Sequence, residues 1–360
     1  MKALVYVAPQ QMEMQELEVP QVGPDDVLIE VAYSGICGSE LSGYLGTNSL
    51  RRPPLVFGHE LSGHVAALDP RVGALRELAV GTPVTVNPLL ACGRCEFCVT
   101  GRQQLCRSRL LLGASVPGCN AEYVSVPASS VLALPGEMDL RRAAMVEPAA
   151  CAAHAVELSG AQPGTSALVV GAGPIGLFIQ QILSLYGVTR RYVSERNAAR
   201  LAMATTMGCI AVPAGAPDAT EAVRQATGGR GVDLAFDAVG SAETRQTTVA
   251  VTVAGGQVIT VGLHTDMTEL PVNTLIRSEL SIRGVFAYSV SSFRAALGWL
   301  AERRIGLEDG VVVAPLSDGP VWYQRLIDGD AAAKVLLSPG SARPQGTGVA
   351  RLEATVGGGT

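Results

Sequence analysis

The stretch SALVVGAGPIGLFIQQILSLYG, residues 166–187, constrains the fold of this chain more than any other feature. The apolar run 167–170 predicts a buried strand, and the apolar positions after the glycines recur at helical spacing. The turn between them has the G-x-G-x-x-G spacing, between a strand and a helix, that a dinucleotide-binding motif requires. Such a turn holds phosphates at the N-terminus of the helix, where free N–H groups and the helix dipole favour anions. The candidate cofactor contacts are Gly171, Gly173, Pro174, Ile175 and Gly176.

The segment that follows indicates which dinucleotide binds. The next predicted strand, 190–194, ends at Glu195, a little over 20 residues beyond the first glycine. A carboxylate there can accept hydrogen bonds from the adenosine ribose hydroxyls and repels a 2′-phosphate, which favours NAD over NADP. Arg196 and Arg200 lie close behind it and could attract that phosphate instead, so both are candidate cofactor contacts and NADP is the alternative. A solvated glutamate at a strand end, with no ligand, is the other interpretation.

Two further segments continue the same pattern. Residues 231–241 and 255–264 each fit a buried strand followed by a turn, with helical stretches between them, and another strand is expected at 281–288. Alternation of strands and helices is typical of a parallel, doubly wound sheet. The predicted fold class is therefore α/β.

Four of the eight cysteines of the chain lie in one short loop, CGRCEFCVTGRQQLC, residues 92–106. Their C-x2-C-x2-C-x7-C spacing lets the loop wrap a tetrahedral ion with four thiolates and no open coordination position, which is typical of structural zinc. Disulfides or reduced, metal-free thiols are the alternatives, but cysteines at x2 spacing are poorly placed to pair, and the cytosol is reducing. The predicted ligands are Cys92, Cys95, Cys98 and Cys106.

Three separate segments carry further residues of the metal-ligand type: Cys37 in GICGSE, the pair His59-Glu60 in FGHEL, and Glu147 in MVEPAA. One thiolate, one imidazole and one carboxylate can bind zinc and leave a fourth position open to water or substrate. The spacing alone supports this only weakly, because a lone Cys, His or Glu is more often a packed or solvated residue than a ligand.

Composition argues against several other classes of protein. The 360-residue chain is 48% hydrophobic, enough for a large core and about two domains. A formal net charge of -5 gives no electrostatic footprint for nucleic acid or an anionic membrane, and the cysteine loop lacks the basic face of a nucleic-acid zinc ribbon. No run of about 20 apolar residues could span a bilayer, and Pro9 comes too early for a signal peptide. We therefore expect a cytoplasmic protein.

Taken in series, Cys37 with GHE, the four-cysteine loop and GAGPIG resemble the zinc-containing medium-chain dehydrogenase/reductase family, and within it the polyol (sorbitol, threonine and butanediol) dehydrogenases. The resemblance covers nearly the whole chain, from MKALVY to AAAKVLL. It implies a GroES-like, β-rich catalytic domain at 1–151, a Rossmann domain at 152–288 and a return to the catalytic domain at 289–360, with a flexible tail at about 341–360. It also implies a homodimer or homotetramer.

The same resemblance implies roles for individual residues. Cys37, His59 and Glu147 match the positions of the catalytic zinc ligands in the polyol subgroup. Glu60 matches the acidic residue that supports the zinc or trades places with its water, which makes it both a metal-binding and a catalytic candidate. Ser39 matches the hydroxyl that begins the proton relay and is the other catalytic candidate.

Two positions depart from the family pattern. Glu40 stands where the family usually has Asp, and its longer side chain is expected still to orient His59. Ser42 stands where many members have the His that ends the proton relay. The proton is therefore expected to leave by another route, through water.

The implied activity is hydride transfer between a secondary alcohol (a polyol, sugar, cyclitol or amino-polyol) and NAD(P), with two zinc ions per chain, one catalytic and one structural. Two alternatives share the fold: an enzyme that uses NAD transiently for an epimerisation or elimination, and a non-catalytic nucleotide-binding relative. Stoichiometric NADH release on adding substrate would separate a dehydrogenase from the first alternative. The intact candidate ligands Cys37, His59 and Glu147 argue against the second.

Overall fold

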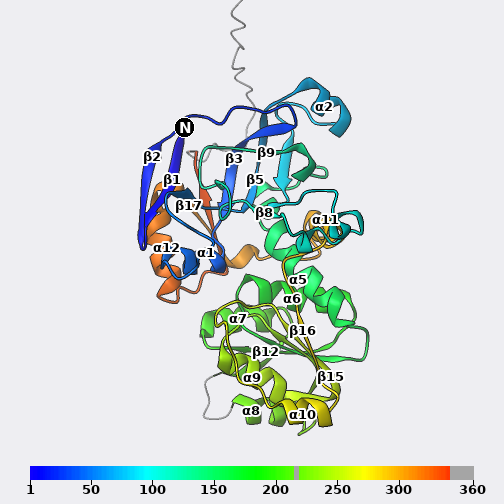
Figure 1. Ribbon diagram of the computed structural model, residues 1–360. Coiled ribbons are helices and arrows are strands. Elements are labelled where there is room, and N and C mark those ends of the chain that lie inside the picture. The colour runs from blue at the N-terminus through cyan, green and yellow to red at the C-terminus, as the bar shows by residue number, and fades with distance from the viewer. Residues whose placement is uncertain (215–218, 341–360) are drawn as a thin grey trace, which may run out of the picture.

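The computed structural model describes residues 1–214 and 219–340, and the predicted tail at 341–360 lies outside them. The chain forms two lobes, one above the other in Figure 1. The upper lobe contains the N-terminal strands together with the last strands of the described chain, and the lower lobe contains the middle of the chain. Helices α5 (Val146–Ser159) and α11 (Val290–Ala301) pack against each other where the lobes meet.

The lower lobe is built on a six-stranded sheet in which every pairing is parallel. Its strand order is β13-β12-β11-β14-β15-β16, so the chain starts at the centre, runs to one edge and then returns to build the other half. This order confirms the predicted doubly wound sheet. The strands are β11 (Ser166–Val170), β12 (Arg190–Glu195), β13 (Ile210–Pro213), β14 (Val232–Asp237), β15 (Thr252–Thr260) and β16 (Ser281–Gly284). The helices are α6 (Pro174–Leu185), α7 (Ala198–Thr206), α8 (Ala219–Ala226), α9 (Ala242–Val251) and α10 (Val272–Arg277).

At the centre of this sheet both faces are buried, which explains why the central strand β11 is a continuous apolar run rather than an alternating one. On β11, Val169 packs in one cluster with Phe178 of α6, while its neighbour Leu168 packs in a second cluster with Val223 of α8 and Val249 of α9. Successive side chains of a strand point to opposite faces, so helices on both sides are needed to cover them.

One predicted strand is too long. Residues 281–288 were expected to be extended throughout, but β16 ends at Gly284, which pairs with Thr260 at the last position of the ladder. Three residues later Ala287 has a φ of 47°, a left-handed conformation that a strand cannot continue through. The chain therefore turns here toward α11 and the upper lobe.

The upper lobe is rich in strands. Its main sheet has the order β10-β6-β5-β3-β18-β17, with β9 also paired to β3, and a smaller sheet has the order β2-β1-β4. Strands β17 and β18 come from the end of the described chain, and β18 pairs antiparallel with β3. The strands are β1 (Lys2–Ala8), β2 (Gln11–Glu16), β3 (Asp26–Gly35), β4 (Leu55–Val56), β5 (Glu60–Leu68), β6 (Pro83–Val86), β7 (Leu89–Leu90), β8 (Leu110–Leu111), β9 (Tyr123–Pro127), β10 (Val131–Ala133), β17 (Val311–Pro315) and β18 (Lys334–Ser338). The helices are α1 (Gly38–Tyr44), α2 (Pro70–Arg76), α3 (Glu96–Val99), α4 (Leu140–Ala143) and α12 (Gly319–Ile327).

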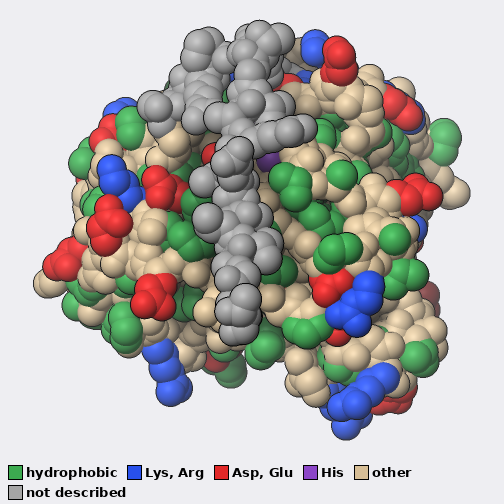
Figure 2. Space-filling model, turned by 90° about the horizontal axis from the view of Figure 1, so that it is seen from above, with side chains coloured by type: hydrophobic (Ala, Val, Ile, Leu, Met, Phe, Trp, Pro, Cys, Tyr) green, Lys and Arg blue, Asp and Glu red, His purple; other side chains and the backbone are tan. Residues whose placement is uncertain are grey.

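None of the helices within 1–214 and 219–340 is long and apolar enough to cross a membrane. Acidic and basic side chains are interspersed on the face of the molecule shown in Figure 2.

Candidate active site

Cys37 lies beside His59 and Glu60, although helix α1 and strand β4 separate it from them in the chain. One ligand atom from each, a sulfur, a ring nitrogen and a carboxylate oxygen, can be chosen so that all lie within 4.8 Å of one another. The register of the main sheet explains the meeting, because Gly35 at the end of β3 pairs with Glu60 at the start of β5. Cys37 follows two residues later as the N-cap of α1. A soft thiolate with an imidazole and a carboxylate is a donor set that fits zinc.

Glu40 orients the His59 imidazole through its Nδ1 atom. Glu40 Oε1 lies 2.7 Å from His59 Nδ1 and accepts a hydrogen bond from Gly58 N (3.1 Å), while Glu40 Oε2 accepts one from the Tyr323 hydroxyl (2.6 Å). Burial alone would raise the pKa of Glu40, but the charge and hydrogen bond of His59 and the charge of Arg51 outweigh it and lower the pKa to about 2. The longer side chain in place of Asp thus still reaches His59, as expected.

Lys334, at the start of β18, is a site residue that sequence reasoning missed. Its ammonium forms an ion pair with Glu60 and donates to the Ile36 carbonyl (2.8 Å), and its side chain is buried. Burial would lower the pKa of Lys334, but the charges of Glu60 and Cys37 raise it above its usual value. One sequence signal was available: Lys334 is one of only two lysines in an arginine-rich chain, and it interrupts the apolar run AAAKVLL.

We expect the Lys334→Met variant to lose about 3 kcal/mol of unfolding free energy, because it leaves the Glu60 carboxylate buried without its cation. Urea unfolding of the zinc-free protein, prepared by chelation, measures this effect. Lys2→Met is the matched control, since Lys2 is exposed. Equal unfolding free energies for the two variants would contradict the assigned role of Lys334.

Glu147 lies beside the cluster rather than within it. It sits in the first turn of α5 and is buried, but it is not a member of the group formed by Cys37, His59 and Glu60. Burial raises the pKa of Glu147 to about 7, while the positive charges of His59 and Lys334 oppose the shift. The charges of His59 and Lys334 therefore reach Glu147, and its place as a ligand of the metal stays a prediction.

Ser39 borders the same cluster, and Ser42 does not. Ser39 Oγ donates a hydrogen bond to Cys37 Sγ (3.4 Å). Ser42 Oγ, one turn further along α1, donates to the Ser39 carbonyl instead (2.9 Å). The hydroxyl at position 42 therefore satisfies the helix backbone and does not extend a path from Ser39.

The four cysteines of the 92–106 loop come together as a second group. Their sulfurs all lie within 4.8 Å of one another, with Cys95 Sγ 3.5 Å and Cys92 Sγ 3.8 Å from Cys98 Sγ. Backbone N–H groups of Arg94 and Cys95 lower the pKa of Cys92 to about 6, whereas burial raises the pKa of Cys98 to about 12. All eight cysteines of the chain are free thiols. Four converging sulfurs with no other donor fit a closed tetrahedral site.

The glycine turn lies at the carboxyl edge of the parallel sheet, where α/β proteins bind nucleotides. Gly171 has a φ of 98°, and a Cβ on Gly176 would collide with the Gly171 carbonyl oxygen. A Cβ on Gly173, in contrast, would meet no described atom within 4 Å, so the space over the start of α6 is open. Pro174 and Ile175 form the first turn of that helix. The cradle therefore fits a pyrophosphate.

Glu195 is brought to this turn by the pairing of β11 with β12. Its carboxylate accepts hydrogen bonds from Ala172 N (2.7 Å) and Asn197 N (2.8 Å). The two neighbouring arginines face other partners: Arg196 pairs with Glu243 (2.6 Å), and Arg200 donates to the Asp330 carbonyl (2.6 Å). The Glu195 carboxylate thus contacts the glycine turn directly through Ala172 N, whereas the guanidinium groups of Arg196 and Arg200 are bonded to Glu243 and to the Asp330 carbonyl.

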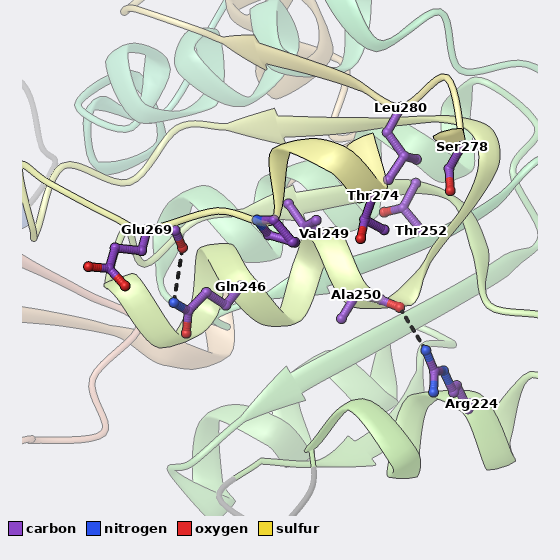
Figure 3. Close-up of a pocket in the computed structure, with 10 residues that line it drawn as sticks. Arg224, Gln246, Val249, Ala250, Thr252, Glu269, Thr274, Ser278 and Leu280 are labelled. Carbon is purple, nitrogen blue, oxygen red and sulfur yellow. Dashed lines mark hydrogen bonds between the residues drawn. The ribbon is translucent and has the colours of Figure 1, made fainter. Parts of the chain in front are cut away.

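A separate groove of about 570 Å³ lies on the lower lobe (Figure 3). Within it Gln246 donates to the Glu269 carbonyl and Arg224 to the Ala250 carbonyl. The groove includes Thr252, the first residue of β15, so it lies at the amino edge of the sheet, opposite the glycine turn. It is therefore no part of the dinucleotide site. It is lined by Arg224, Gln246, Val249, Ala250, Thr252, Glu269, Pro271, Thr274, Ser278 and Leu280.

Comparison with known proteins agrees with this geometry. Residues 23–136 match the alcohol dehydrogenase GroES-like domain, and residues 174–302 match the zinc-binding dehydrogenase domain. A sorbitol dehydrogenase of Bacillus subtilis (strain 168) is 32% identical over 297 residues, which are 80% of this chain and 83% of the relative. The chain belongs to the zinc-containing medium-chain dehydrogenase/reductase family. A D-arabitol-phosphate dehydrogenase of Enterococcus avium is 31% identical over 338 residues, 92% of this chain and 95% of the relative.

A solved structure supports the same membership. The alcohol dehydrogenase TADH from Thermus sp. ATN1 superposes on this medium-chain dehydrogenase with a TM-score of 0.87 at 29% identity, covering 94% of this chain and 99% of the other. The resemblance and the fold class predicted from the sequence, a GroES-like domain with a Rossmann sheet, are therefore confirmed. So is the class of activity: the chain is a zinc-type oxidoreductase that uses a nicotinamide cofactor on a small-molecule substrate.

Proposed function

We propose that this chain is an NAD-dependent dehydrogenase of polyols or closely related secondary alcohols, with one catalytic and one structural zinc ion. The observation that carries the proposal is the convergence of Cys37, His59 and Glu60 on one point. When bound, zinc would polarise the alcohol oxygen and the nicotinamide would accept the hydride. The side chains around the cluster would bind the metal, orient its ligands and position the alcohol.

The residues around the cluster have separable tasks. Cys37, His59 and Glu60 would bind the catalytic metal, and Glu147 would face its open side. Glu40 fixes the imidazole through Nδ1, which leaves the other ring nitrogen free for the metal. Ser39 supplies a hydroxyl at the edge of the cluster, where the substrate oxygen would bind. Together they hold the alcohol at a fixed orientation, which is where enzymes gain much of their rate.

The relatives support polyols as the substrate class. The two curated relatives described above are named for sorbitol and for D-arabitol phosphate, which are a polyol and a polyol ester. Sugars, cyclitols and amino-polyols share the same reacting group, a secondary alcohol flanked by hydroxyls. The small residues Gly38 and Ser39, which directly follow Cys37, leave room for such neighbouring hydroxyls, and a Cβ on Gly38 would meet no described atom within 4 Å.

The preference for NAD rests on the charges around Glu195. A carboxylate anchored by two backbone N–H groups at the glycine turn would meet the adenosine ribose and repel a 2′-phosphate. Arg196 and Arg200, the residues that could attract that phosphate, are engaged by Glu243 and the Asp330 carbonyl.

Replacing Glu195 with Gln tests this preference. The amide keeps an acceptor oxygen but removes the negative charge, so we expect kcat/KM with NADP, relative to NAD, to rise about 10-fold or more. The ratio is measured by initial rates with each cofactor. Glu302→Gln, an exposed glutamate of the α11 C-terminus, is the control and should leave the ratio unchanged. An unchanged ratio in Glu195→Gln would contradict NAD selection by this charge.

Three broader proposals follow from the same reasoning. The catalytic domain would comprise 1–151 and 289–360 and the Rossmann domain 152–288, with the first boundary inside α5; the arrival of β17 and β18 in the main sheet supports this division. We also propose a homodimer or homotetramer, since the edge strand β16 is exposed along its length and carries unpaired backbone groups. We further propose that the protein is cytoplasmic, because its eight cysteines are free thiols and the cytoplasm is reducing.

The function is tested by measuring NADH formation with a panel of polyols, sugars, cyclitols, amino-polyols and simple secondary alcohols. We expect stoichiometric NADH release with at least one polyol and two zinc ions per chain by mass spectrometry. Substrate turnover without net NADH release would instead indicate an epimerisation or elimination. Cofactor binding without any turnover would indicate a non-catalytic relative.

A further inference from the structure

The Ser39 hydroxyl has a partner that the sequence did not indicate. Arg51, in the loop between α1 and β4, donates from Nη2 to Ser39 Oγ (3.2 Å) and from Nη1 to the Ser39 carbonyl (3.1 Å). The Arg51 side chain is only 3% exposed, while the adjacent Arg52 is exposed. Both arms of this buried guanidinium are therefore directed at one residue, the candidate catalytic serine.

The Arg51 side chain packs closely against Gly43 and Phe57. A Cβ on Gly43, in the last turn of α1, would collide with Arg51 Cδ, so a glycine there leaves the space that the Arg51 side chain occupies. On its other side the guanidinium lies over the ring of Phe57, with Arg51 Cζ 5.7 Å from the ring centroid, a favourable cation–π geometry. The position of Arg51 is thus fixed by packing as well as by hydrogen bonds.

Neither Ser42 nor Arg51 can take a proton onward from Ser39. Ser42 Oγ donates its one hydrogen to the Ser39 carbonyl, so it does not carry a proton away from Ser39 Oγ. A guanidinium is permanently charged and only donates hydrogen bonds, so it cannot accept a proton either. Ser39 Oγ must therefore act as the acceptor toward Arg51, and its own hydrogen must point elsewhere. In the structure it points to Cys37 Sγ, 3.4 Å away.

We propose that Arg51 is a positioning residue that fixes the Ser39 hydroxyl as a donor toward the Cys37–His59–Glu60 group, and that no side chain among residues 1–214 and 219–340 carries a proton onward from Ser39. The inference rests on the proposed function. Arg51 acts on catalysis through the Ser39 hydroxyl, which would donate a hydrogen bond to the substrate oxygen. The proton that leaves the alcohol would pass directly to water, to which the half-buried Ser39 leaves access.

A double-mutant cycle tests this proposal. It compares Arg51→Gln, Ser39→Ala and the double variant, using kcat for the best polyol of the panel and the calorimetric Kd of trifluoroethanol, an alcohol that resists oxidation, for the NAD-saturated protein. We expect Arg51→Gln to lower kcat about 10- to 100-fold and to weaken trifluoroethanol binding about 5-fold, with the KM for NAD and the zinc content unchanged. In the Ser39→Ala background, Arg51→Gln should have no further effect on either quantity.

The outcomes separate this role from others. An effect through Glu40, whose pKa the charge of Arg51 helps to lower, would persist in the Ser39→Ala background and overturn the proposal. The matched control is Arg52→Gln, because Arg52 is the exposed neighbour and donates to the Ser49 carbonyl; this variant should behave as wild type. If Arg51→Gln fails to fold, Arg51→Lys gives a smaller loss that should again vanish without Ser39. A wild type that oxidises no alcohol refutes the proposed function, whereas additive losses refute only the role of Arg51.

Discussion

Replacing Cys37 with serine is expected to abolish turnover while leaving NADH binding intact. The thiolate is one of three protein donors at the proposed catalytic metal, and a serine hydroxyl is a neutral and much weaker ligand for zinc. The glycine turn that would bind the cofactor lies in the other lobe and does not depend on Cys37. We expect kcat to fall at least about 1,000-fold, zinc content to fall from two to one per chain, and the Kd of NADH, measured by fluorescence, to change less than about 2-fold.

The matched control is Cys209→Ser, since Cys209 is a buried thiol outside both groups of candidate metal ligands. It should retain activity and both zinc ions. Wild-type activity in Cys37→Ser would refute the assignment of the catalytic metal. Loss of NADH binding in the same variant would show that the two lobes do not act independently in cofactor binding.

Replacing Cys98 with serine should have the largest effect on stability. Cys98 is a buried member of the four-sulfur group, and the regular structure of the loop 92–106 is limited to the one-turn helix α3 and a 3-10 turn at Gln103–Leu105. A structural zinc site supplies folding free energy directly, on the order of 10 kcal/mol for an isolated zinc-binding peptide. We expect the variant to lose one zinc ion per chain and its Tm to fall by at least about 5 °C.

Calorimetry and metal analysis measure these changes, with Cys209→Ala as the control of matched burial: Cys98 is 6% and Cys209 7% exposed. The cofactor affinity of Cys98→Ser should be preserved at low temperature, since the loop lies outside the parallel sheet. A variant that keeps both zinc ions would contradict a closed site made by these four sulfurs.

The cofactor lobe was largely predictable because its motif is local. A strand, the short turn 171–173 and a helix are adjacent in the chain, so the positions of Gly171 and Gly176 follow from backbone geometry alone. The same holds for Cys92 and Cys98, whose short separation limits the ways a loop can close. The predicted strand 281–288 failed at Gly284 because the chain leaves the sheet there to reach the upper lobe, a turn that no local pattern announced.

The catalytic cluster was predictable only in part. Family resemblance indicated Cys37, His59 and Glu60, whereas spacing alone did not, since their meeting depends on the β3–β5 register. Glu147 was expected among the ligands but lies beside the three-residue group, and its distance to a bound metal remains a prediction for the experiment above.

By itself, the sequence determined the elements whose parts are neighbours in the chain: the strand–glycine turn–helix unit, the four-cysteine loop and the α/β alternation. Only the tertiary structure decided which distant charges meet. It paired Lys334 with Glu60 and directed Arg51 onto Ser39. The physical reason is that short-range spacing fixes backbone geometry over a few residues, whereas the partners of a buried charge are chosen by sheet register and by the packing space that a residue such as Gly43 leaves open.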